Sequence, residues 1–424
     1  MREWIQKVRT GFLKSFWIAN TLELFERLAF YGSKAVLAVY LANKVGLADE
    51  AGTLAGLYSA VIYSLPIVAG VFVDKYGFRK TLLTCFAVFT IGYFLIGMAG
   101  LEFGQGLVNA IGKKPYTIAV LMLTAIGGSL IKPCIVGTVK KTTNKDTSEL
   151  GFSIYYTLVN IGGAIGPIIA LQVRENLGIE YVLVMSSVTS LLNFIGTFIF
   201  FKEPESLESK TEHKTFSQVF SDMLLVFKNI RFISFLVIFS GFWIMFWQIF
   251  YSFPFYITDV LKFEKFEILE TVDAWTIIFL SVPITALAKR LSPILAMTLG
   301  FFLASFCWIL IGMSPTIFAA IIGVSLFAVG EATQAPRFYD YVGNLAPKDQ
   351  VGTFMGFAFL PVAIGSFLAG TIADWLRGNY LYTLPSGELH YDPMMWYIMA
   401  GIGFVSTGLM LLYNVLFVKK PVAA

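Results

Sequence analysis

Histidine, cysteine and charged residues are all scarce in this chain of 424 residues. It has 2 His and 3 Cys, and Cys85, Cys134 and Cys307 fall within or at the edge of apolar segments, so we expect neither a disulfide framework nor a metal centre. His213 and His390 are both expected in loops, which leaves no histidine relay inside a membrane. Charged residues make up only 14% of the chain, too few for a soluble enzyme.

Motifs of catalysis and cofactor binding are absent as well. There is no H-E-x-x-H pattern, no nucleophile paired with a base, and no P-loop lysine beside the Gly-Gly pairs at 127–128 and 162–163. No arginine-rich tract with interleaved aromatic residues is present. We therefore expect no enzyme activity, no cofactor, no metal and no nucleic-acid partner.

What the chain has in abundance is hydrophobic sequence. Hydrophobic residues make up 57% of it, and apolar stretches of about 20 residues, the length of a helix that crosses a bilayer, recur along it. Twelve are predicted, at residues 15–42, 52–73, 80–100, 116–137, 151–171, 180–201, 231–258, 271–288, 292–313, 315–336, 351–373 and 393–418. The predicted fold class is therefore an all-α membrane protein with 12 transmembrane helices.

The basic residues indicate how these helices are oriented. If the N-terminus is inside, most of the 31 Lys and Arg residues lie in cytoplasmic loops, as the positive-inside rule requires. We therefore expect both termini in the cytoplasm. The first apolar segment is too long for the core of a signal peptide and carries three charged residues in succession, Glu23, Glu26 and Arg27, so we expect it to be retained. Short loops and the lack of a targeting sequence favour a prokaryotic inner (cell) membrane. We expect a monomer in contact with the lipid bilayer.

The longest polar interruption divides the chain into two halves. It carries Pro204 and charges of alternating sign, and it is long enough for one short amphipathic helix on the inner surface but not for two further spans. We predict an N-terminal six-helix bundle at 1–201, a cytoplasmic linker at 202–230 and a C-terminal six-helix bundle at 231–424. Two bundles of six helices are typical of transporters that hold substrate near the midplane between the halves.

The loop between the second and third predicted helices has a distinctive spacing. It reads G-x-x-x-D-K-x-G-x-R-K, with these residues at the defined positions: Gly70, Asp74, Lys75, Gly77, Arg79 and Lys80. We expect Gly70 to allow close helix approach, Gly77 to relax a tight turn, and Asp74 to pair with cationic groups at neighbouring helix ends. The loop resembles the signature of the major facilitator superfamily. That resemblance implies the major facilitator fold and a conformational gate that includes Gly70, Asp74, Gly77 and Arg79; an ordinary positive-inside turn is the alternative.

Ionisable side chains occur inside stretches that are otherwise apolar enough to cross a bilayer. They are Glu23, Glu26, Arg27, Lys34, Lys132 and Glu331. A charge at this depth costs roughly 2.5–3.5 kcal/mol on insertion scales, so we expect these side chains to face a wet cavity or one another. Those of the first helix share one face with Phe30. Glu23 and Arg27 have the i, i+4 spacing of an ion pair; a purely structural bridge would not require a second carboxylate and a lysine on the same face.

The first helix also resembles that of the proton-coupled oligopeptide transporter family, a branch of the major facilitator superfamily. The family pattern is E-x-x-E-R-F-x-Y-Y-G, and this chain reads E-L-F-E-R-L-A-F-Y-G from Glu23 to Gly32. Four further elements match the family in order: Tyr63, Pro66, Gly70 and Asp74 in the second helix; Gly127, Gly128, Lys132 and Pro133 in the fourth; Phe152 to Gly162 in the fifth; and Gly330, Glu331, Pro336, Leu345, Ala346 and Pro347 around the tenth.

The resemblance implies symport of di- and tripeptides with protons by alternating access. A short peptide is a zwitterion, so its site needs a cation for the carboxylate, an anion for the amine and neutral groups for the backbone. Arg27 and Lys132 suit the carboxylate, and Glu331 suits the amine. The remaining residues expected to bind substrate are Tyr31, Lys34, Tyr63, Asn160, Trp243 and Gln248.

Proton coupling is assigned to Glu23, Glu26, Arg27 and Lys132. On this hypothesis a substrate carboxylate displaces a glutamate from Arg27 or Lys132, and the released glutamate takes up a proton. The neutralised pair then permits the two halves to rock. The proton gradient is the energy source, so no cofactor is required.

The chain departs from the family in its seventh and eleventh helices. Phe246 and Trp247 stand where the family has an acidic residue before a Gln, and Ala358 stands where it has a Trp. Because both changes alter the expected pocket, an alternative is a major facilitator carrier of another small molecule (a drug, an amino-acid derivative or an anion) with altered or absent proton coupling. Asp273, expected at the outer start of the eighth helix, is assigned only a capping role.

Overall fold

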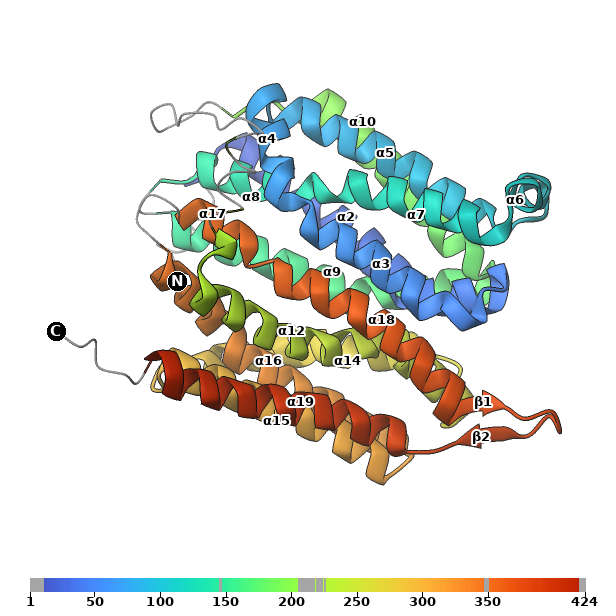
Figure 1. Cartoon of the computed structure of the whole chain (residues 1–424). Helices are drawn as coiled ribbons and strands as arrows, with labels where there is room; N and C mark the ends of the chain where they lie inside the picture. Colours follow the sequence, from blue (N-terminus) through green and yellow to red (C-terminus); the bar gives the residue numbers. More distant parts are fainter. Residues whose placement is uncertain are drawn as a thin grey trace. The chain divides into compact units, whose positions relative to one another are not determined.

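The computed structural model describes residues 11–144, 147–204, 218, 224, 226–346 and 351–418. Nearly all of these residues are helical (Figure 1), because a helix satisfies every backbone N–H and C=O group within one apolar segment. The chain forms two compact units: the described parts of Met1–Val36 and Leu65–Val219 make the first, and those of Leu37–Ser64 and Phe220–Ala424 make the second.

The first unit contains α2 and the elements from α4 to α10. They are α2 (Lys14–Val39, as far as Val36), α4 (Pro66–Tyr76), α5 (Phe78–Met98), the single turn η3 (Glu102–Gly104), α6 (Gln105–Ile111), α7 (Lys113–Ser129), α8 (Ile131–Thr142), α9 (Ser148–Asn176) and α10 (Ile179–Phe200). α10 lies along α5 (Figure 1). It is also bonded to α2, since Ser186 Oγ donates to Ala29 O at 3.1 Å and Asn193 Nδ2 donates to Leu22 O at 3.1 Å.

The second unit contains the remaining elements. They are η1 (Tyr40–Val45), η2 (Ala48–Glu50), α3 (Ala51–Ser64), α12 (Ile230–Tyr251), α13 (Phe253–Asp259), α14 (Phe266–Ala288), α15 (Pro293–Met313), α16 (Ile317–Leu345), α17 (Val351–Phe357), α18 (Leu360–Tyr380), β1 (Leu381–Thr383), β2 (Leu389–Tyr391), α19 (Met394–Tyr413) and η4 (Asn414–Val418). α15 packs between α16 and α19, and α12 packs against α18.

Helix α3 belongs to the second unit, although the boundary at residue 201 would place it in the N-terminal bundle. Its glycines explain the packing: a Cβ atom at Gly52 or Gly56 would meet the backbone of α18, where Gly370 faces them. Three glycines at one crossing let the two helix backbones approach closely. The predicted bundle and linker boundaries stay a prediction.

Ten helices in the described residues are long and apolar enough to cross a membrane, and eleven if α3 and α4 are counted as one broken span. Helix α2 is 26 residues long. It is not among the ten, because every stretch of 18 residues within it contains the three charged residues Glu23, Glu26 and Arg27. The predicted count of twelve therefore stays a prediction.

Several spans predicted as continuous helices are interrupted. The span at 52–73 breaks at Leu65 because Pro66, the first residue of α4, has no N–H group with which to continue the ladder. Likewise, α12 ends at Tyr251 and α13 begins at Phe253, with Pro254 in its first turn. Leu130 separates α7 from α8, so the segment that carries Lys132 has a helix of its own.

A β-hairpin joins α18 to α19, and no strand was expected there. β1 and β2 pair antiparallel, with Leu381 opposite Tyr391 and Tyr382 opposite His390. His390 therefore lies in a strand instead of a loop. The predicted amphipathic linker helix and His213 lie outside the described residues, apart from isolated positions in the linker.

Candidate functional site

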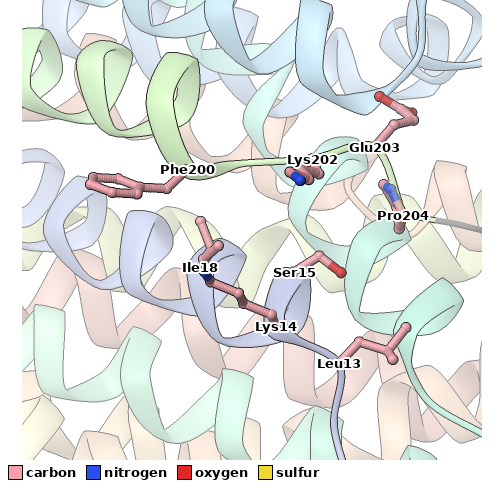
Figure 2. A pocket seen from close by; sticks show the side chains of 8 residues that line it. All are labelled: Leu13, Lys14, Ser15, Ile18, Phe200, Lys202, Glu203 and Pro204. Atoms are coloured by element: carbon pink, nitrogen blue, oxygen red, sulfur yellow. The ribbon is translucent and has the colours of Figure 1, made fainter.

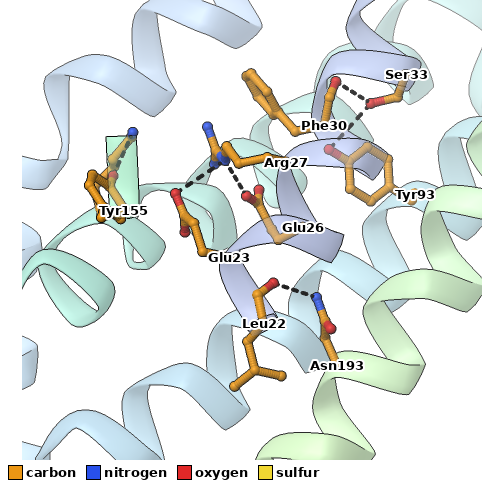
Figure 3. A network of polar contacts seen from close by, with 10 residues as sticks. Leu22, Glu23, Glu26, Arg27, Phe30, Ser33, Tyr93, Tyr155 and Asn193 are labelled. Atoms are coloured by element: carbon orange, nitrogen blue, oxygen red, sulfur yellow. Dashed lines mark hydrogen bonds and ion pairs between the residues drawn. The ribbon is translucent and has the colours of Figure 1, made fainter. Parts of the chain in front are cut away.

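Two glutamates converge on one arginine along the polar face of α2 (Figure 3). Arg27 Nε lies 2.5 Å from Glu26 Oε2 and 3.4 Å from Glu23 Oε1. All three residues are buried, with exposed fractions of 0% for Glu23, 3% for Glu26 and 3% for Arg27. Both oxygens of Glu23 and one of Glu26 accept no hydrogen bond. The i, i+4 pair expected from the sequence is therefore present, with Glu26 bound more closely than Glu23.

Packing against α9 positions Arg27. A Cβ atom at Gly162 would collide with the Cβ of Arg27, and one at Gly166 would lie 2.7 Å from Leu28 O, so these glycines allow α9 to lie directly on α2. The guanidinium also lies over the ring of Phe30, with Cζ 4.7 Å from the centroid. A cation over an aromatic face is stabilised by the ring quadrupole, more strongly where water is excluded.

Lys132 approaches this cluster from α8. Its Nζ lies 3.1 Å from Tyr155 OH of α9 and interacts electrostatically with Glu23, Glu26 and Arg27. Two carboxylates thus face two cations. Such a set is neutral when all four groups are ionised, so one more negative charge would leave it unbalanced.

Other predicted residues of the first unit surround the cluster at varying distances. Tyr31 is half-buried, and its ring centroid lies 6.0 Å from Arg27 Cζ. Lys34 is buried one turn beyond Phe30 and two turns beyond Arg27. Asn160 Nδ2 donates to Tyr156 O of its own helix at 2.9 Å, which leaves its carbonyl oxygen and its second N–H for a ligand.

In the second unit, Glu331 lies on α16 with Oε2 buried and accepting no hydrogen bond. Among the residues that the structure describes in this unit, it forms no ion pair. Trp243 on α12 likewise has a buried indole N–H without an acceptor. A buried carboxylate oxygen without a hydrogen bond is costly, so a cationic group of a ligand would be stabilised beside it.

Tyr63 and Gln248, both predicted to bind substrate, have different surroundings in the second unit. The ring of Tyr63 lies 5.8 Å from that of Trp247. Gln248 is fully buried: its Nε2 donates to Ala369 O at 3.0 Å, and its Oε1 accepts from Ser252 at 2.6 Å. In this conformation the Gln248 amide therefore joins α12 to α18.

The two departures from the family pattern change the apolar surface in opposite directions: Phe246 adds a ring where the family has an acid, and Ala358 is smaller than the family's Trp. Phe246 lies between Trp243 and Trp247, with ring centroids 5.1 and 5.2 Å away, and Ala358 is buried between α17 and α18. Aromatic rings therefore occupy this part of α12, where the family pattern has an acid.

Asp273 is a residue whose place the sequence reasoning misjudged. Because α14 begins at Phe266, Asp273 lies two turns inside the helix and does not cap it. Its Oδ1 is buried without a hydrogen bond, and its carboxylate interacts electrostatically with Glu331. Glu331 therefore has a second acid in its surroundings, which only the packing of α14 on α16 could reveal.

The predicted gate loop forms the turn between α4 and α5. Gly77 has φ of +81°, which only glycine adopts readily, and Arg79 donates to Phe198 O at 2.6 Å. No described atom lies within 4 Å of a Cβ built at Gly70, so this glycine does not mediate the expected close approach. Asp74 is exposed.

Glu203 stabilises this turn and was not anticipated. Its carboxylate accepts hydrogen bonds from Phe78 N at 2.7 Å and Arg79 N at 2.9 Å, the first amides of α5. An acid at a helix N-terminus satisfies free N–H groups and the helix dipole. Since Glu203 follows Phe78 by 125 residues, no local motif indicates the contact.

Known proteins resemble this chain over most of its length. Residues 22–370 match the family model described as Major Facilitator Superfamily. The chain is 27% identical over 190 residues to dipeptide and tripeptide permease B of Aliivibrio fischeri (44% of this chain, 36% of that protein) and 30% identical over 157 residues to peptide transporter family 1 of Drosophila melanogaster (36% and 20%). It spans about a third or less of the length of these curated relatives.

Solved structures extend the likeness to nearly the whole fold. The crystal structure of a POT family transporter in complex with a thioalcohol-conjugated peptide covers 94% of this chain and 96% of that one, with a TM-score of 0.75 and 16% identity. A peptide transporter POT in complex with sulfate gives a TM-score of 0.75 and 17% identity over 95% and 94%. The predicted helical membrane fold of the major facilitator superfamily is confirmed, as is the resemblance to oligopeptide transporters. The count of twelve helices stays a prediction.

Proposed function

Because this chain belongs to the major facilitator superfamily, we propose that it is a secondary active transporter that carries di- and tripeptides together with protons. Alternating access, in which two helical bundles rock about one binding site, is the way such folds transport. The relatives named as peptide permeases support this substrate class. No cofactor enters the proposal, because the proton gradient supplies the energy.

The observation that carries the proposal is the cluster of Glu23, Glu26, Arg27 and Lys132. Its charges balance only while both carboxylates are ionised. A peptide carboxylate that binds Arg27 or Lys132 adds a negative charge in a buried setting. A proton on one glutamate restores neutrality, so substrate and proton enter the cluster together.

The ends of a peptide call for groups of opposite charge, and the proposed substrate residues include both kinds. For the peptide carboxylate they include the guanidinium of Arg27, which can bind a carboxylate through two parallel hydrogen bonds, and the ammonium of Lys132. For the peptide amine they include Glu331. Tyr31, Lys34, Tyr63, Asn160, Trp243 and Gln248 complete the proposed substrate residues. Gln248 would have to release Ala369 and Ser252 to contribute.

The conformational gate belongs to the same proposal. Gly77 allows the turn from α4 to α5, and Arg79 ties that turn to Phe198 at the end of α10. Gly70 and Asp74 lie on α4 beside it. We place the protein in a cell membrane as a monomer with both termini in the cytoplasm.

A carrier of another small molecule, with altered or absent proton coupling, is the second candidate. The aromatic series Trp243, Phe246, Trp247 and Phe250 on α12 favours it, with ring centroids of consecutive members 5.1 to 5.9 Å apart. Such a surface suits an apolar drug or amino-acid derivative better than a peptide backbone.

Uptake of labelled dialanine into proteoliposomes with an acid-outside gradient distinguishes the two candidates. We expect accumulation by the wild type and loss of accumulation in Arg27→Ala and Glu331→Gln. If the wild type ignores dipeptides but transports an aromatic compound under the same gradient, the second candidate replaces the first.

A further inference from the structure

A cavity of about 320 Å³ lies between the start of α2 and the end of α10 (Figure 2), and neither Glu23 nor Glu26 lines it. Leu13 and Ile18 of α2 and Phe200 of α10 form its apolar walls. Lys14 and Lys202 line it from the same two helix ends. The proposed transport mechanism uses none of these residues.

The cavity is positively charged. Its one acid is Glu203, whose carboxylate is already engaged by the N–H groups of Phe78 and Arg79. Neither ammonium group forms an ion pair with another described residue. Two lysines in a shared, mostly apolar hollow create an attractive potential for an anion.

The residues around the cavity indicate its depth. Trp17 is 37% exposed and packs edge-on against Phe16 and Phe12, and an amphipathic indole at a helix end is typical of the headgroup level of a bilayer. Phe200 is 59% exposed at the last turn of α10. The cavity thus joins a basic rim at headgroup level to an apolar surface of the kind that faces acyl chains.

We propose that this cavity binds an anionic phospholipid, with the headgroup phosphate between Lys14 and Lys202 and an acyl chain along Ile18 and Phe200. Basic pockets between membrane helices on the cytoplasmic side recognise such headgroups. A soluble anion would use the two lysines but leave the apolar walls in water, so the lipid matches more of the surface. Because Lys202 precedes Glu203, the bound headgroup would lie beside the residue that caps α5.

Native mass spectrometry of the full chain in detergent tests this proposal with three probes: phosphatidylglycerol, phosphatidylcholine with the same acyl chains, and inorganic phosphate. We expect the wild type to retain phosphatidylglycerol in preference to phosphatidylcholine. The double variant Lys14→Gln/Lys202→Gln should weaken phosphatidylglycerol binding by roughly tenfold or more. The control Lys140→Gln/Lys228→Gln removes the same charge from two other exposed lysines and should bind like the wild type.

Equal binding of phosphatidylglycerol by the wild type and Lys14→Gln/Lys202→Gln would overturn the proposal. So would equal retention of the two lipids, or retention of phosphate alone. If the double variant does not fold, a photoactivatable phosphatidylglycerol on the wild type replaces it. Labelled peptides must then include residues 13–18 or 200–204, and labelling only elsewhere refutes the site.

Discussion

The backbone of Gly162 in α9 lies directly against the Cβ atom of Arg27 in α2, with no room for a side chain at that position. The most deeply buried cation of the proposed coupling site is therefore held in place by a glycine on another helix. Close packing of this kind makes the geometry of the cluster depend on a residue that takes no part in its chemistry.

Gly162→Ala should consequently destabilise the protein. The added methyl group forces α9 away from α2 or displaces Arg27, and overpacking of this kind costs about 1–3 kcal/mol. We expect a melting temperature lower by several degrees in detergent, measured by intrinsic fluorescence. Gly401→Ala in α19, where a Cβ meets no atom within 4 Å, should leave it unchanged; equal shifts for both variants would contradict the packing argument.

Glu26→Gln should uncouple transport from the proton gradient. The amide keeps the size of the side chain but cannot take up the proton that offsets a substrate carboxylate. In proteoliposomes, accumulation driven by an acid exterior should fall to the level seen without a gradient, while exchange of labelled for unlabelled peptide continues. Glu102→Gln, at an exposed acid, serves as the control. Full gradient-driven accumulation by Glu26→Gln would mean that another residue takes up the coupled proton.

Tyr155→Phe should weaken substrate binding through Lys132. The hydroxyl that lies 3.1 Å from Lys132 Nζ is lost, and a hydrogen bond to a charged group contributes about 1.5–3 kcal/mol. If the missing hydrogen bond destabilises the peptide-bound state by this amount, the half-saturating peptide concentration should rise roughly tenfold or more. Tyr181→Phe on the exposed surface of α10 should match the wild type. An unchanged half-saturating concentration in Tyr155→Phe would mean that Tyr155 does not orient Lys132 for substrate binding.

Asp374→Ala should destabilise the second unit. Its carboxylate accepts from Gly52 N at 2.8 Å and Thr53 N at 2.7 Å, and so caps α3 from α18. Loss of a helix cap costs about 0.5–2 kcal/mol, which a chemical denaturation midpoint in mild detergent would register. Asp340→Ala removes an acid that is 60% exposed and should have little effect. A midpoint equal to that of the wild type would mean that other groups satisfy these amides.

Local periodicity was enough to predict the polar face of α2. Glu23, Glu26 and Arg27 recur at helical spacing, so any helix through them brings the three side chains together whatever surrounds it. The same reasoning failed for Asp273, which was taken for a cap although the helix begins earlier. It also gave no indication that the Gln248 amide donates to Ala369 of another helix.

By itself the sequence determined the membrane class, the helical fold and the charged residues at bilayer depth, because apolar length and helical spacing are properties of short segments. The tertiary structure alone decided which distant groups meet them. Glu203 caps α5, Asp374 caps α3, and Gly162 makes room for Arg27, and each of these contacts joins residues more than 100 positions apart. Backbone amides at helix starts and the space beside a helix carry no residue-specific signal, so their partners are fixed only when the helices pack.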